Sequence, residues 1–232
     1  MLILLHGLGL SKNIWDKLIP LIDCEVIAKD LPGHGGSDFI YYDWKSIWLD
    51  TINSLQERDI TKASVVLHSF SAGALPEILN HRKQPQMIYL LEGIIHPDDA
   101  KWTKVIANMN ADEYESWLLK WRSVSNMTLK SQLVRSQSKQ DIKKWSSGFR
   151  LVKEEALYSM SKQLQSRVNS KELEFCLSSS ERNLVYLKGS KSKVSSSGIN
   201  FVKQCGCRVE ELQDSGHFPM LDNPLALARL LN

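Results

Sequence analysis

Short apolar runs alternate along this chain with stretches of helical pattern. Most of these runs are nearly continuous in apolar residues and end in glycine or polar turns, as expected of strands buried on both faces of a parallel sheet. The runs are Leu2–Leu5, Glu25–Ala28, Ser64–Leu67, Met87–Leu91, Leu184–Leu187 and Arg208–Leu212. Helical patterns between them include 43–58 and 72–82. This alternation predicts an α/β fold with a mostly parallel sheet flanked by helices.

The alternation breaks between about residues 97 and 180, where no run indicates a strand. Amphipathic patterns rich in tryptophan and lysine occupy this segment, and 111–122 places Trp117 and Trp121 on one helical face. The segment is too long for a loop. It predicts a helical lid, residues 95–179, inserted after the strand that ends at Glu92. Residues 1–94 and 180–232 then form the core.

The composition fits a globular protein with this organisation. The chain has 232 residues, of which 43% are hydrophobic and 24% charged. A net charge of +3 is too small to indicate a nucleic-acid partner. No apolar stretch reaches the roughly 20 residues of a membrane span. The apolar start lacks the basic residues of an export signal, and the four cysteines are too scattered for a disulfide framework. We expect a cytoplasmic protein.

Candidate chemistry gathers where the predicted strands end, which is where ligands bind in α/β sheets. Four strand ends carry motifs: His6-Gly7-Leu8-Gly9, Asp30-Leu31-Pro32-Gly33-His34-Gly35-Gly36-Ser37-Asp38, His68-Ser69-Phe70-Ser71-Ala72-Gly73, and Asp214-Ser215-Gly216-His217-Phe218-Pro219. In this order the motifs closely resemble those of the α/β-hydrolase superfamily, across nearly the whole chain except the lid. The resemblance implies an α/β-hydrolase sheet, a serine nucleophile and no metal or organic cofactor.

Two serines compete for the nucleophile position at the strand-to-helix turn. The residues two places before and after the nucleophile must be small, because backbone and helix crowd them. For Ser71 these positions hold Ser69 and Gly73; for Ser69 they hold Leu67 and Ser71. Leu67 is too large for the turn on this reasoning, so the pattern favours Ser71. His217, after the last strand, is the expected general base.

The acid of the triad departs from the family pattern. Ser192 stands where most relatives carry an aspartate, and serine cannot stabilise an imidazolium as a carboxylate does. Glu92 ends the preceding apolar strand, where a carboxylate is costly without a polar partner. Certain haloalkane dehalogenases of the superfamily carry their acid at this strand end. We therefore expect Glu92 to hold His217; the alternative is that Glu92 caps a lid helix or pairs with a basic residue.

The remaining expected site residues follow from these assignments. The amides of Ala72, next to the assigned nucleophile, and of Leu8, by family resemblance, form the oxyanion hole. Aromatic side chains of the lid are the candidate substrate contacts, most of them serving as lid core. They are Trp102, Trp117, Trp121 and Trp145.

The predicted function is cleavage of an ester or thioester through an acyl-enzyme, by a carboxylesterase-like hydrolase. The same triad serves C–C hydrolases and lyases, and a noncatalytic binding protein with a degenerate site is a further alternative. Besides the small-molecule substrate, an acidic acyl carrier protein is a possible partner through basic residues of the lid. Those residues include Lys120, Arg122, Lys130 and Arg135, although a solvated helix face is the favoured explanation for them.

Overall fold

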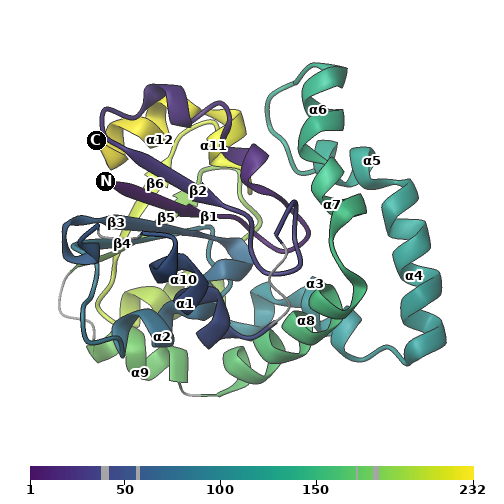
Figure 1. Ribbon diagram of the computed structural model, residues 1–232, viewed down its shortest axis with the longest axis horizontal. Helices are drawn as coiled ribbons and strands as arrows, with labels where there is room; N and C mark the ends of the chain where they lie inside the picture. The colour runs from purple at the N-terminus through teal and green to yellow at the C-terminus, as the bar shows by residue number, and fades with distance from the viewer. Residues whose placement is uncertain (38–41, 56–57, 171, 180–182) are drawn as a thin grey trace.

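A computed structural model describes residues 1–37, 42–55, 58–170, 172–179 and 183–232 (Figure 1). Asp38, residues 56–57 of the predicted helix 43–58, and the predicted boundary at residue 180 lie outside the described residues. Six strands form one parallel sheet in the order β2-β1-β3-β4-β5-β6. Their bounds are Leu2–Leu5 (β1), Val26–Lys29 (β2), Ser64–His68 (β3), Met87–Leu91 (β4), Leu184–Gly189 (β5) and Arg208–Leu212 (β6). The predicted parallel α/β sheet is confirmed.

Helices cover both faces of the sheet, because side chains alternate between the faces along each strand. Ile3, Leu5 and Val65 point to the face packed by α1 (Trp44–Asn53), α2 (Leu75–Leu79) and α10 (Ser196–Gln204). Leu2, Leu4 and Val66 point to the face packed by α11 (Pro219–Asp222) and α12 (Pro224–Leu231). Figure 1 shows these two helical layers on opposite sides of the strands.

The segment 72–82, expected to be one helix, is a 3-10 turn followed by a short α-helix. A tight 3-10 turn, Ser69–Ala74, follows β3 directly and leads into the short α2. A Cβ atom at Gly73 would lie 2.3 Å from the ring of Trp44 on α1, so only glycine allows the turn to approach this closely. The tight turn therefore starts directly after His68, the last residue of the strand.

Residues 95–179, called here the insertion, lie between β4 and β5, and their described part contains a short 3-10 helix, Pro97–Asp99, and seven α-helices. The α-helices are α3 (Lys101–Ala107), α4 (Ala111–Ser123), α5 (Ser125–Lys130), α6 (Lys139–Trp145), α7 (Ser147–Leu151), α8 (Glu154–Asn169) and α9 (Glu172–Ser179). Asn110 and Glu113 form a capping box that starts α4. In Figure 1, α4 to α7 stand beside the sheet, whereas α8 and α9 return beneath it.

The last part of the insertion joins the packing of the sheet. Met160, Leu164 and Val168 of α8 and Leu173 and Leu177 of α9 belong to the core cluster that contains Val65 and Leu67. Within the described residues, no helix has the length and apolar character required to span a membrane.

Candidate active site

Two neighbouring strands deliver a serine and a glutamate to the same edge of the sheet. His68 of β3 and Leu91 of β4 are register partners, so Ser69 and Glu92 follow at equivalent positions. Both residues have left-handed backbone conformations, with φ of 54° and 53°. This conformation is uncommon for residues other than glycine and concentrates at functional sites. Each turn directs its side chain out of the strand line at the carboxyl end of the sheet.

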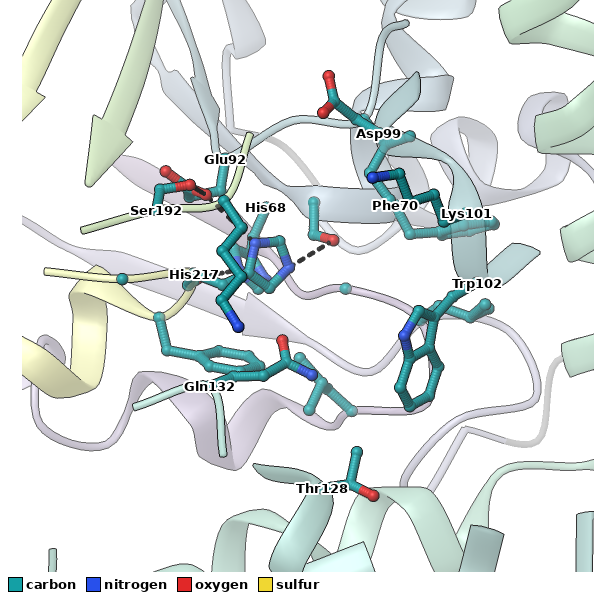
Figure 2. Close-up of a pocket in the computed structure, with 18 of the residues that line it drawn as sticks. His68, Phe70, Glu92, Asp99, Lys101, Trp102, Thr128, Gln132, Ser192 and His217 are labelled. Atoms are coloured by element: carbon teal, nitrogen blue, oxygen red, sulfur yellow. Dashed lines mark hydrogen bonds and ion pairs between the residues drawn. The ribbon is translucent and has the colours of Figure 1, made fainter. Parts of the chain in front are cut away.

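The loop after β6 brings His217 between these two side chains. His217 Nε2 lies 3.0 Å from Ser69 Oγ, and His217 Nδ1 lies 3.3 Å from Glu92 Oε2. Figure 2 shows His217 and Glu92 converging in the pocket. The side chain of His217 is 29% exposed, whereas that of Glu92 is fully buried. This serine–histidine–carboxylate order matches the geometry that nucleophilic acyl transfer requires.

The expectation that Ser71 faces His217 is wrong. Ser71 is fully buried, and its hydroxyl donates to the carbonyls of Leu5 and His68, both at 3.0 Å. The strand β3 runs one residue beyond the predicted end, to His68, which moves the turn to Ser69. Leu67 does not obstruct this turn, because its side chain lies in the core cluster with Val65. The polar role of Ser71 is to tie the turn to β1 and β3.

Glu92 is held by donors from the loop that follows β5. Its Oε1 accepts the amide N–H of Gly189 at 2.6 Å, and its Oε2 lies 2.5 Å from the hydroxyl oxygen of Ser192. Asp214, the other carboxylate close to His217 in the sequence, instead pairs with Arg135, and both of these side chains are exposed. The structure thus brings Glu92 to His217, as the sequence predicts. It adds Ser192, which sequence reasoning treated as a vacated position.

His68 is a second residue that sequence reasoning missed. Its Nε2–H donates to the backbone carbonyl of His217 at 2.9 Å, and the two rings have centroids 5.1 Å apart. Burial holds the pKa of His68 well below its ordinary value, so the ring is neutral. A histidine directly before the nucleophile turn, on a strand otherwise apolar, was the available signal. Its contact fixes the loop that carries His217.

The expected oxyanion donors need one correction. Leu8 lines the cavity beside Ser69, as expected for the first donor. Ala72 does not line it and is completely buried in the core cluster. With the turn at Ser69, the residue that follows the serine is Phe70, which does line the cavity. With Ser69 at the turn, the expected pair of oxyanion donors becomes the amides of Leu8 and Phe70.

A cavity of about 650 Å³ opens at Ser69 and His217. Its apolar wall includes Trp102, Trp121, Phe149 and Phe218, and its polar lining includes Thr128 and Gln132 (Figure 2). Two of the four tryptophans expected as substrate contacts, Trp102 and Trp121, therefore face the cavity. The other two are packing residues: Trp117 stacks on Trp121 with ring centroids 5.2 Å apart, and Trp145 is buried beneath the ammonium of Lys17.

Asp222 joins the His217 loop to the insertion. One carboxylate oxygen accepts the amides of Val134 and Arg135, at 2.9 and 3.1 Å, and the other accepts the amide of Gly216 at 2.9 Å. Asp222 is 1% exposed, and all three partners are backbone donors that suit a buried carboxylate. Among the residues that the structure describes, no group of three His, Cys, Asp or Glu side chains could hold a metal ion.

Solved structures with this architecture include several hydrolases. An esterase from Exiguobacterium antarcticum is similar with a TM-score of 0.80 and 17% sequence identity, over 99% of this chain and 89% of that chain. A haloalkane dehalogenase loop variant from Bradyrhizobium elkanii gives 0.76 and 19%, over 99% and 86%. A hydrolase from Pseudomonas aeruginosa gives 0.71 and 15%, over 98% and 86%. Identities this low establish a shared fold.

At the level of sequence, no curated protein matches the chain significantly. The sequence profile of the alpha/beta hydrolase family matches residues 2–129, which is more than half of the chain. This range contains the strand-end motifs up to Glu92, and the parallel sheet extends the likeness beyond it. The chain belongs to the alpha/beta hydrolase family.

Proposed function

We propose that this protein is a serine hydrolase that cleaves a carboxylic ester or thioester through an acyl-enzyme on Ser69. The observation that carries the proposal is the chain of contacts from Ser69 Oγ to His217 Nε2 and from His217 Nδ1 to Glu92 Oε2, at 3.0 and 3.3 Å. A serine hydroxyl needs an adjacent base to become a nucleophile, and the base needs a partner that fixes its tautomer. The site supplies both.

Each step of the reaction has a group in place. Ser69 Oγ attacks the acyl carbon while His217 Nε2 takes its proton, and Glu92 stabilises the imidazolium. The amides of Leu8 and Phe70 receive the negative charge of the tetrahedral intermediate. His217 then protonates the leaving alcohol or thiol. Water, deprotonated by His217, attacks the acyl carbon and releases the acid together with free Ser69.

Haloalkane dehalogenation does not suit this nucleophile. Attack of a serine oxygen on a carbon–halogen bond would leave an ether, which has no carbonyl carbon for water to attack. A carboxylate nucleophile would instead leave an ester that water can cleave. Ser69 therefore supports acyl transfer, including the C–C bond cleavage that the same triad can perform, and not halide displacement.

The cavity lining supports a substrate with an apolar group beside the scissile bond. We propose that residues 95–179 act as a lid whose tryptophans, Trp102 and Trp121, contact that group. An acidic carrier protein is not part of the proposal. Two of the basic residues that suggested it are paired within the chain: Arg122 binds Glu154, and Arg135 binds Asp214.

Fluorophosphonate labelling followed by peptide mass spectrometry tests the nucleophile. We expect the label on Ser69, and Ser69→Ala to lose both labelling and hydrolysis of p-nitrophenyl butyrate. Ser71→Ala should keep the label, because it loses only internal hydrogen bonds that are worth about 1 kcal/mol each. Glu92→Gln should lower kcat by about 10²–10⁴.

The alternatives give different results in the same experiment. Label on Ser71, or full turnover by Ser69→Ala, would overturn the assignment. A folded protein that takes no label and turns over no ester would instead support the noncatalytic binding protein.

A further inference from the structure

The hydroxyl of Ser192 contacts the same carboxylate oxygen that faces His217. Ser192 Oγ lies 2.5 Å from Glu92 Oε2, and it also accepts the amide N–H of Val194 at 3.1 Å. An ionised carboxylate can only accept hydrogen bonds, so the hydroxyl proton of Ser192 points to Glu92. The contact from Val194 fixes the side chain in that orientation. Ser192 is therefore a directed donor and not a freely rotating surface hydroxyl.

Glu92 needs such donors because no water reaches its side chain. The fully buried carboxylate accepts Gly189 N–H on Oε1, and on Oε2 it meets both Ser192 and His217 Nδ1. An uncompensated buried carboxylate would be neutralised by protonation. A protonated Glu92 could no longer stabilise an imidazolium at His217. The three donors together replace the lost hydration of the carboxylate and fix its two oxygens in space.

We propose that Ser192 is a positioning residue, whose hydroxyl holds Oε2 of Glu92 in line with Nδ1 of His217. The inference rests on the proposed function, since it assigns Glu92 as the acid of the triad. It also explains the residue at this place in the chain. Where most relatives carry the acid itself, this chain carries a small donor that supports an acid supplied from β4.

The expected effect follows from the geometry of the contacts. Without the hydroxyl of Ser192, only the amide of Gly189 orients the carboxylate of Glu92 beside its contact with His217. The contact between Nδ1 and Oε2 then loses part of its fixed direction, so Glu92 stabilises the imidazolium of the transition state less well.

Other ionisable groups face this pair from the surrounding elements, and they stay unchanged in the test. They are His68 from β3, Tyr186 from β5, Asp98 and Asp99 from the turn after β4, and Lys191 and Lys193 from the loop after β5. None of them is altered when only the hydroxyl of Ser192 is removed. A shift in the variant is therefore attributable to the lost donor.

The experiment compares Ser192→Ala, Ser192→Thr and the control Ser190→Ala in the full-length protein. Ser190 lies on the same loop, and its buried hydroxyl has no hydrogen-bond partner among the described residues. For Ser192→Ala we expect kcat for p-nitrophenyl butyrate to fall about ten- to a hundredfold, with KM nearly unchanged, as for loss of a hydrogen bond to a charged group. Ser192→Thr restores the donor and should recover most of the rate, and Ser190→Ala should match the wild type.

The proton NMR signal of His217 Nδ1–H, assigned through its loss in His217→Gln, gives a readout independent of catalysis. In Ser192→Ala this signal should move or broaden, because Oε2 of Glu92 is no longer held in line with Nδ1, while Ser192→Thr and Ser190→Ala leave it in place. Wild-type kcat and an unchanged signal in Ser192→Ala would overturn the inference. Equal loss in Ser192→Ala and Ser192→Thr would do the same, because it would indicate a steric role. A wild-type protein without Ser69-dependent turnover would refute the proposed function, while the NMR signal would still test the contact.

Discussion

Buried histidines distinguish this protein at the scale of single residues. His6 and His34 are completely buried with ring centroids 5.4 Å apart, close to the carboxylate of Asp30. His6 Nε2 accepts the amide of Leu31, and His34 Nδ1–H donates to the carbonyl of Pro32. Burial lowers the pKa of His6 to about 4 and that of His34 to about 3. Both rings are therefore neutral turn-fixing groups over the whole physiological range.

These lowered pKa values predict acid sensitivity of folding. The unfolded chain binds protons at these histidines below its pKa of 6.5, whereas the folded chain does not until about pH 4 for His6 and about pH 3 for His34. Stability is therefore present above pH 6.5 and is lost as the pH falls towards these folded values. At pH 5 each histidine costs about 2 kcal/mol. His34→Gln, which keeps a donor for Pro32, should reduce the loss between pH 7 and pH 5 by about this amount in urea unfolding. An unchanged pH slope in that variant would contradict the assignment.

The residue scale also shows why sequence reasoning chose the wrong serine. Pattern analysis located the turn to within two residues, but the choice between Ser69 and Ser71 depended on where β3 ends. That end is set by pairing with β4, in which His68 meets Leu91. Glu92 was predictable because a carboxylate at the end of an apolar strand is costly to bury without a polar partner. The contact from Ser192 to Glu92 was not, since it joins residues 100 positions apart in the chain.

At the scale of structural elements, α8 holds the turn that carries Ser69 through one arginine. Arg167 of α8 donates to the carbonyl of Gly73 at 2.5 Å and binds both carboxylate oxygens of Glu77, at 2.5 and 2.9 Å. Its guanidinium also lies over the ring of Trp44, 5.4 Å from the centroid. A planar, bidentate donor suits this position, which a lysine could not fill equally well. The insertion thereby fixes the segment that follows the nucleophile turn.

We expect Arg167→Met to destabilise the protein by about 2–4 kcal/mol, because it leaves Glu77 without its partner in a mostly buried place. Arg167 and Glu77 are 12% and 20% exposed in their side chains. Arg135→Met is the matched control, since Arg135 and Asp214 are 51% and 66% exposed. Its cost should stay below about 1 kcal/mol in chemical denaturation. Adding Glu77→Gln to Arg167→Met should recover part of the loss; a fully additive double variant would argue against the pairing.

At the scale of elements, the sequence predicts whether a segment is a helix or a strand more readily than it predicts the elements against which that segment packs. All six strands were expected from short runs that are mostly apolar, and the pattern over 111–122 matched α4 closely. No strand was expected in the insertion, and its described residues form helices joined by turns and loops. Periodicity shows which face of a helix is buried but not against what. For this reason the contribution of α3, α4, α5 and α7 to the cavity lining, and the packing of α8 and α9 beneath the sheet, came only from the structure.

Across the whole molecule, the insertion and the sheet share one core. The cluster that contains Leu2, Leu4 and Val66 of the sheet also contains Trp121 of α4 and Phe149 of α7. The contact is close: a Cβ atom at Gly9, in the loop after β1, would lie 2.6 Å from the Trp121 ring and 2.9 Å from the Phe149 ring. An insertion that packs directly on the loop after β1 cannot loosen without disturbing that loop.

This shared core predicts that the insertion and the sheet unfold together. Phe149→Ala removes a side chain that is 4% exposed and should cost about 3–5 kcal/mol. In hydrogen exchange followed by mass spectrometry, the variant should lose protection equally in α4 of the insertion and in β1 and β3 of the sheet, because these strands exchange through global unfolding. Loss of protection confined to α4 to α7 would show that the insertion opens as a separate unit. Leu151→Ala on the same helix, whose side chain is 60% exposed, should leave protection in both regions close to that of the wild type.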